Sequence, residues 1–387
     1  MVHTSRGNRN RHARPSGKEV CYERVGCFKD DLTWWTGILS RRLAGLPWSP
    51  EKINTRFLLY TIHNRHDHQE ISAVNYSTIR ASNFGTNKMT RINIPGWNTN
   101  GKWQRHICNT LLQVEDVNCI NLDWLNGSLE YNHAVNNLPV VSAEVAYFVD
   151  ILRTKFGYPP SKVHLIGHSL GAHLAGDAGA RIPGLGRITE AYFSLDCNHA
   201  RSHRFYAESI LNPDAFIAYP CRSYDNFKAG DCFHCPKEGC PTMGHFADRF
   251  HLKNTTNDRP YYFLNTGTFS PFARWRHKLT IKLSGNNSTN GKLFLRVGGT
   301  IRKTGELEIA SGKLKPGMTY TTFIDADVDV GNITSIEFTW KEYSFKHSQN
   351  RLGAEMVTDV SGKYGYKSTF CSPDTVDSNI PQILTPC

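Results

Sequence analysis

The sequence lacks any apolar stretch long enough to cross a membrane as a helix, so we expect no transmembrane segment. A membrane-spanning helix needs roughly 20 apolar residues in a row, and no run in this chain approaches that length. Residues 1–17 also lack the apolar core of a signal peptide, so we do not expect this stretch as written to direct secretion. The same stretch has almost nothing to bury, and we expect it to be disordered.

Acidic residues are fewer than basic ones. The chain has 34 Asp and Glu against 45 Lys and Arg, which gives a net charge of +11. Four of these charges are arginines within residues 1–17, which contain no acid, so +7 is left for the remainder. The excess leaves two interpretations open, an anionic partner or surface and an ordinary solvated basic surface. Aromatic residues at 11% indicate a globular protein with a core.

The eleven cysteines favour an oxidising compartment through their spacing. Local pairs predict disulfides, although connectivity does not follow from one sequence, and Cys197 is left over. The candidate pairs are Cys21/Cys27, Cys108/Cys119, Cys221/Cys232, Cys235/Cys240 and Cys371/Cys387. Six Asn-x-Ser/Thr sequons add to the prediction of secretion. They stand at Asn75, Asn126, Asn254, Asn286, Asn287 and Asn332.

Residues 163–171 carry the most specific chemical signal. The apolar run 163–166 predicts a buried strand, and Gly167-His168-Ser169-Leu170-Gly171 follows it as G-x-S-x-G. The next nine residues are mostly small and predict a helix. Strand, tight turn and helix together indicate a nucleophile elbow, which lifts the Ser169 hydroxyl above the sheet edge. The Leu170 amide is then a candidate oxyanion donor, whereas we expect His168 and His173 to be packing or loop residues.

Strands and helices alternate around this elbow. The predicted strands are residues 56–60, 91–94, 119–124 and 187–189, and the predicted helices are residues 140–156 and 204–218. This alternation indicates an α/β fold with a mostly parallel sheet covered on both faces. A cysteine-rich loop spans residues 221–240.

After about residue 275, apolar and polar residues alternate with a period of two. This period predicts antiparallel strands, and we expect an all-β sandwich. The apolar triplets are Leu279/Ile281/Leu283, Leu293/Leu295/Val297 and Ile336/Phe338/Trp340. We therefore predict a basic tail at residues 1–17, an α/β domain at residues 18–270 and a sandwich domain at residues 275–387.

Motifs in both domains resemble the pancreatic lipase family. The clearest are KEVCYE at 18–23, LPWSPE at 46–51, TRFLLY at 55–60, VHLIGHSLGA at 163–172, CNH at 197–199 and LNPD at 211–214. The resemblance extends from Lys18 to Cys387 and implies an α/β-hydrolase domain followed by a PLAT β-sandwich. It also implies secretion, hydrolysis of lipid esters at an interface, and a colipase-like protein as a candidate partner of the sandwich.

The resemblance assigns roles to single residues. Ser169 matches the family nucleophile, and His199 matches its general base. The family's oxyanion loop usually reads His-Gly-Phe, and here it reads Pro95-Gly96-Trp97. Trp97 still offers its backbone N–H, which is the group that the chemistry needs, although Pro95 has no N–H of its own.

The resemblance also indicates what is missing between elbow and base. In the family, the strand after the elbow ends in Gly-Leu-Asp-Pro-Ala-Gly-Pro, and this Asp orients the histidine. Here residues 186–193 read GRITEAYF, and the chain continues directly with the segment that closes the lid. The absent block implies that the chain lacks the family's acid, calcium loop, next strand and lid, and the partner of Cys197. We therefore expect no metal cofactor and an unpaired sheet edge.

Three carboxylates lie between Ser169 and His199. Asp177 is eight residues into the helix, roughly 12 Å along its axis, and should point away. Asp196 is expected to cap or solvate its own loop. Glu190 lies at the end of the correct strand, where it either replaces the missing acid or is an exposed charge, so the triad acid stays unassigned.

Three functional interpretations remain. The first is an ester hydrolase that is impaired, because loss of the orienting acid can cost roughly 10⁴-fold in turnover. The second is an inactive relative whose sandwich binds lipid surfaces or a partner. The third is a zinc knuckle, since Cys232-x2-Cys235-x4-Cys240-x4-His245 loosely fits that spacing; the region lacks the surrounding pattern of a nucleic-acid module, and we expect no nucleic-acid partner.

Overall fold

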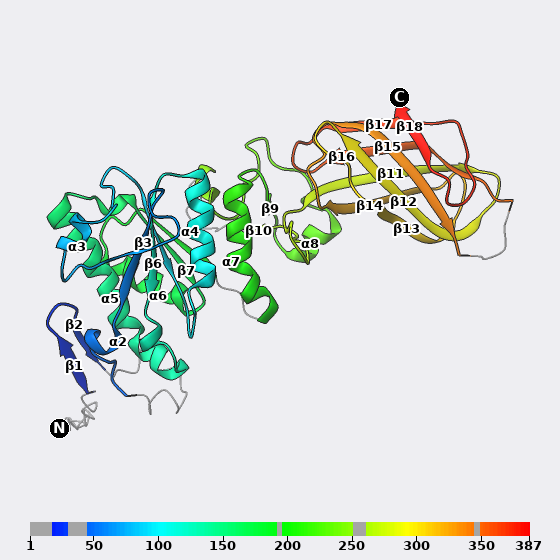
Figure 1. Cartoon of the computed structure of the whole chain (residues 1–387). Coiled ribbons are helices and arrows are strands. Elements are labelled where there is room, and N and C mark those ends of the chain that lie inside the picture. The colour runs from blue at the N-terminus through cyan, green and yellow to red at the C-terminus, as the bar shows by residue number, and fades with distance from the viewer. Residues whose placement is uncertain (1–17, 30–44, 192–195, 251–260, 344–348) are drawn as a thin grey trace, which may run out of the picture. The chain divides into compact units, whose positions relative to one another are not determined.

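The computed structural model describes residues 18–29, 45–191, 196–250, 261–343 and 349–387. The predicted tail at residues 1–17, the side chains of Asp196 and Cys197, and the sequon at Asn254 lie outside the described residues. The chain forms two compact units, residues 1–203 and residues 204–387, and Figure 1 traces both.

The first unit is built on a six-stranded sheet in the order β4-β3-β6-β5-β7-β8. Its strands are β3 (Arg56–Tyr60), β4 (Gln69–Ile71), β5 (Thr90–Ile94), β6 (Asn118–Asp123), β7 (Val163–His168) and β8 (Arg187–Ala191). From β6 to β8 the strands are parallel, whereas β3 is antiparallel to both neighbours. All but the last residues of β6 and β7 are buried, as expected for parallel strands covered on both faces. The predicted α/β sheet and its four strands are confirmed.

Helices cover both faces of this sheet. The longer ones are α4 (Lys102–Val114), α5 (Tyr131–Phe156) and α6 (Leu170–Arg181), and the short ones are α2 (Pro50–Ile53) and α3 (Ser77–Arg80). A further long helix, α7 (Asp196–Leu211), follows β8 in the chain. α5 and α6 share one core with the strands, while α4 packs on the other face (Figure 1). By length and composition alone α5 would pass as a membrane span, but 67% of its apolar window is buried inside the structure, which is the character of a core helix.

The predicted helix at residues 204–218 is misplaced. α7 begins at Asp196 and ends at Leu211, so His199 lies in its first turns and not in a loop. The helix ends there because Pro213 disfavours helical geometry in the residue before it.

A disulfide-bonded hairpin precedes the sheet. Its strands are β1 (Glu19–Tyr22) and β2 (Gly26–Lys29). Arg24, at its turn, donates to Glu144 Oε1 of α5 at 2.9 Å and to Glu51 at 3.1 Å. Burial raises the pKa of Glu144, so the Arg24 guanidinium offsets the cost of a carboxylate that is largely removed from water.

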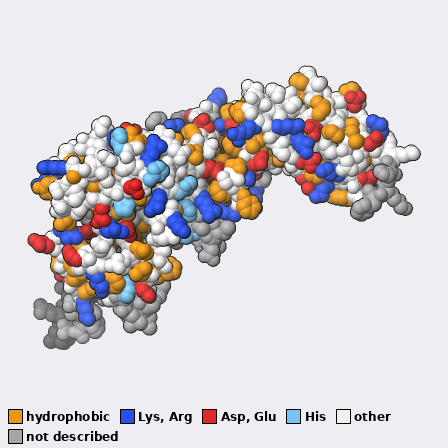
Figure 2. All heavy atoms as spheres, in the orientation of Figure 1, with side chains coloured by type: hydrophobic (Ala, Val, Ile, Leu, Met, Phe, Trp, Pro, Cys, Tyr) orange, Lys and Arg blue, Asp and Glu red, His pale blue; other side chains and the backbone are white. Residues whose placement is uncertain are grey.

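The second unit contains the predicted sandwich. Its eight antiparallel strands are β11 (Trp275–Gly285), β12 (Thr289–Gly299), β13 (Leu307–Leu314), β14 (Thr319–Ala326), β15 (Ile333–Glu342), β16 (Leu352–Ser361), β17 (Lys367–Cys371) and β18 (Gln382–Pro386). They follow the order β13-β12-β15-β18-β17-β16-β11-β14. All three predicted apolar triplets lie in one buried cluster, which confirms the alternation. Basic and acidic side chains are interspersed on the sandwich face that Figure 2 shows.

Residues 204–250 and 261–272 belong to the second unit and pack against the start of the sandwich. They include β9 (Tyr219–Pro220), α8 (Tyr224–Ala229) and β10 (Tyr262–Phe263). Arg276 of β11 is only 3% exposed and stacks on the Phe227 ring, 4.0 Å from its centroid. Its Nη2 also donates to the Phe227 carbonyl at 2.9 Å. The buried guanidinium therefore receives one ring contact and one hydrogen bond from α8, while Phe323 and Asp325 of β14 add a second ring at 5.3 Å and an ion pair at 3.5 Å.

All five predicted disulfides are present. Two of them, Cys221–Cys232 and Cys235–Cys240, use the cysteines of the zinc interpretation. The fourth candidate ligand, His245, is buried and its Nδ1 is 2.9 Å from the Tyr206 hydroxyl. The zinc interpretation is therefore wrong, because disulfide sulfurs are not thiolate ligands.

The Phe227–Arg276 contact predicts a large stability effect in the second unit. Phe227→Ala should lower the free energy of unfolding by about 3–5 kcal/mol, since it empties a fully buried site and uncovers the Arg276 guanidinium. Lys228→Ala, on the exposed face of the same helix, is the control and should change it little. Calorimetry of the full chain measures both, and equal losses for the two variants would contradict the packing described.

Candidate active site

Ser169 stands at a strained turn between β7 and α6. Its backbone has φ 61° and ψ −128°, a region that side-chain-bearing residues rarely occupy. The turn closes only because the glycines two residues before and after Ser169 lack a Cβ: a Cβ at Gly167 would lie 2.4 Å from the Gly171 carbonyl oxygen. A Cβ at Gly171 would lie 2.2 Å from the Ile94 carbonyl oxygen. This backbone geometry is that of a nucleophile elbow.

The Pro95-Gly96-Trp97 loop lies directly against the elbow. A Cβ at Gly96 would be 2.7 Å from the Ser169 Cβ and 3.0 Å from the Leu170 amide nitrogen. The buried Trp124 ring donates from Nε1 to the Pro95 carbonyl at 2.9 Å, which holds the loop although Pro95 itself has no N–H. Trp97 is anchored in turn by its own Nε1, which donates to the Leu129 carbonyl at 3.0 Å.

Two amides at this junction are available for a ligand. Among the hydrogen bonds within the described residues, none uses the N–H of Trp97 or of Leu170 as donor. Leu170 is the first residue of α6, so its N–H needs no partner within the helix and the helix dipole favours negative charge beside it. Both amides therefore suit a developing oxyanion next to Ser169.

The structure brings His199 to the elbow from α7. Its ring centroid is 4.7 Å from that of His168, the residue before Ser169. The His199 carbonyl accepts hydrogen bonds from His168 Nε2 at 3.0 Å and from Ser202 Oγ at 2.9 Å. Ser169 and His199, the candidate nucleophile and the candidate base, thus lie on neighbouring elements that touch each other.

Neither described carboxylate between these two residues is directed at His199. Asp177 accepts a hydrogen bond from Arg181 at 3.0 Å within α6. Glu190 pairs in register with Gly167, and Ala191 with His168. Since neighbours along a strand point to opposite faces, Glu190 points away from the His168 face, and its Oε1 lies 3.3 Å from where a Gly176 Cβ would be. Asp196, the third candidate, has a side chain outside the described residues.

Sequence reasoning missed two residues of this site. Trp103 of α4 packs its ring 5.4 Å from that of His168 and 5.7 Å from that of His203, one turn after His199. His168 was expected to be a packing or loop residue, yet it donates a hydrogen bond to the backbone carbonyl of His199. Figure 2 shows histidine side chains gathered on the face where α4 and α7 lie. The sequence held one signal for this cluster: His203 follows His199 by four residues, and positions i and i+4 share a helix face.

Two other features do not belong to this site. A cavity of about 300 Å³ is lined by Pro95 and Gly96, and also by Arg56 and Arg105, but neither Ser169 nor His199 lines it.

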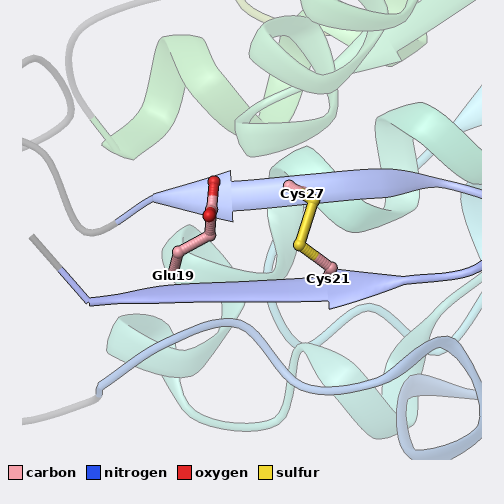
Figure 3. Close-up of side chains that lie close together, drawn as sticks. All are labelled: Glu19, Cys21 and Cys27. Atoms are coloured by element: carbon pink, nitrogen blue, oxygen red, sulfur yellow. A yellow bond between two sulfur atoms is a disulfide. The ribbon is translucent and has the colours of Figure 1, made fainter.

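In the described part of the chain, Glu19, Cys21 and Cys27 are close enough to share a metal ion (Figure 3). Cys21 and Cys27 form a disulfide, so Glu19 alone remains as a ligand and the group is not a metal site.

Comparison with known proteins agrees with this geometry. Residues 18–193 and 189–272 match the family described as Lipase, and residues 278–384 match the PLAT/LH2 domain. Pancreatic lipase-related protein 3 from Homo sapiens is 60% identical over 452 residues, with 96% of this chain and 97% of the relative covered. That alignment is longer than this 387-residue chain, and the two Lipase segments meet at residues 189–193. Both facts agree with an absent internal block at this position.

Two further human relatives differ in activity by name. Pancreatic triacylglycerol lipase is 40% identical over 456 residues, covering 96% of this chain and 97% of that protein. Inactive pancreatic lipase-related protein 1 is 40% identical over 454 residues, with the same two coverages.

The close approach of Gly96 to the elbow predicts a strong effect of one methyl group. In Gly96→Ala the new Cβ would meet Ser169, so reaction of Ser169 with a fluorophosphonate probe should fall by about 10²-fold. Gly305→Ala, where a Cβ has open space, is the control and should react like the wild type. Unchanged labelling of Gly96→Ala would show that the loop does not abut the nucleophile.

Proposed function

Because this chain belongs to the pancreatic lipase family, we propose that it is a carboxylic ester hydrolase for lipid-type esters, with Ser169 as nucleophile and His199 as general base. The observation that supports this most directly is the strained backbone of Ser169, flanked by two amides available for an oxyanion. Strain of this kind collects at functional sites.

The proposed reaction uses the four groups in sequence. Ser169 Oγ attacks the ester carbonyl carbon while its proton passes to the His199 imidazole. The carbonyl oxygen becomes an oxyanion and accepts hydrogen bonds from the Trp97 and Leu170 amides. His199 returns the proton to the leaving alcohol, an acyl-serine forms, and water then releases the carboxylic acid by the same steps.

Two features of the sequence lead us to propose a low rate. The chain lacks the Asp that ends the family's strand after the elbow, and an acid that orients the histidine is worth roughly 10⁴-fold in turnover. The segment between β8 and α7 is also too short to hold a lid over the site. We therefore propose weak hydrolysis of small soluble esters and no activation by an oil–water interface.

A second function has its own support in the structure. The sandwich is complete, with eight strands and a single buried core, and one relative of this chain is inactive by name. A chain whose hydrolase domain fails to react would still present its sandwich domain to a lipid surface or a colipase-like protein. The five disulfides and the exposed sequons at Asn75, Asn126 and Asn332 support an extracellular location for either function.

The proposal predicts a defined pattern of reactivity. The full chain should react with a fluorophosphonate at Ser169 and hydrolyse a short soluble ester slowly, with no rise in rate above the solubility limit of the substrate. Ser169→Ala should abolish both reactions. Mass spectrometry of the labelled peptide and a rate profile across the solubility limit are the measurements. Absence of labelling together with binding to lipid vesicles would favour the second function.

Glu190 offers a separate test of the missing acid. Because Glu190 faces α6, Glu190→Gln should leave the ester hydrolysis rate unchanged. Asp177→Asn, which removes the carboxylate of an ordinary helix ion pair, is the matched control. A loss of about 10²-fold or more in Glu190→Gln alone would identify Glu190 as the orienting acid.

A further inference from the structure

His168 is a half-buried imidazole that the reaction outlined above does not use. Its Nε2 lies 3.0 Å from the His199 carbonyl oxygen. A carbonyl oxygen only accepts hydrogen bonds, so Nε2 carries the hydrogen. Burial lowers the pKa of His168, which favours the neutral ring with Nδ1 bare. His168 is therefore set as a fixed donor and not as a second base.

Ring contacts hold this donor in place from three sides. The His168 ring lies 4.7 Å from the His199 ring, 5.3 Å from the His203 ring and 5.4 Å from the Trp103 ring. Trp103 comes from α4, His168 from the end of β7, and the other two from successive turns of α7. The first turns of α7 are thus held between α4 and the elbow.

We infer that His168 is a positioning residue, which fixes the α7 turn that carries His199 relative to the nucleophile by donating to the His199 carbonyl. The inference rests on the proposed function, because it assigns the base's placement to that site. Ser169 follows His168 directly in the chain, so one residue links the backbone of the nucleophile to the backbone of the base. A carboxylate orients a histidine through its ring, whereas His168 does so through the main chain.

The test compares two unbranched replacements of similar length in the full chain. His168→Gln keeps an N–H donor, whereas His168→Met keeps the bulk and loses the donor. We expect His168→Met to lower kcat for a short ester by about 10²-fold with KM unchanged, since misplacement by about 1 Å costs that much. We expect His168→Gln to stay within a few-fold of the wild type. His106→Met, at an exposed position of α4, is the control and should have no effect.

A second readout separates this inference from the proposed function. Hydrogen exchange at the His203 amide, four residues after His199, should be faster in His168→Met than in His168→Gln if the donor anchors α7. Equal exchange in the two variants, or equal kcat, would overturn the inference. If wild-type Ser169 does not react with a fluorophosphonate, the proposed function fails, and exchange alone then decides whether His168 anchors α7.

Discussion

The hydrolase unit depends on how closely three backbone segments approach one another at the elbow. Gly167 and Gly171 allow the turn at Ser169 to close, and Gly96 allows the neighbouring loop to lie against it. Any side chain at these three positions would collide with backbone or with Ser169. The strained backbone of Ser169 costs of order 1–3 kcal/mol, and it persists because β7 is paired with strands on both sides.

Strands and disulfides could be predicted from the sequence where a single pattern of apolar residues or a single cysteine spacing determines them. Continuous apolar runs indicated the parallel strands, alternation in the triplet around Ile281 indicated the sandwich, and short cysteine spacings indicated the disulfides. α7 was misplaced because its first turns, around His199, carry polar and charged residues with no apolar stripe. The contact of Trp103 with His203 and the hydrogen bond from His168 to His199 hold those turns, and tertiary contacts of this kind override local propensity.

The proposed roles of single residues could likewise be predicted only in part. Those of Ser169 and Leu170 follow from G-x-S-x-G, a motif whose spacing determines the backbone conformation. The orientation of Glu190 depends on its register with Gly167, and a shift of one residue would turn it to the other face. His168 could not be assigned in advance, because its acceptor is a main-chain carbonyl 31 positions away, and a carbonyl has no sequence signature. Arg276 was missed likewise, since its partner ring belongs to a separate short helix.

The disulfides have a consequence for how this chain matures. Each closes a loop of only 5 to 16 residues. At a synthesis rate of roughly 5–20 residues per second, both cysteines of a pair leave the ribosome within a few seconds of each other. Cys21–Cys27 and Cys108–Cys119 can therefore form before β8 and α7 leave the ribosome, and the other three pairs lie in the second unit and close loops that contain neither element. A fully oxidised chain reports that these short loops have closed, and it carries no information on whether the hydrolase unit has assembled.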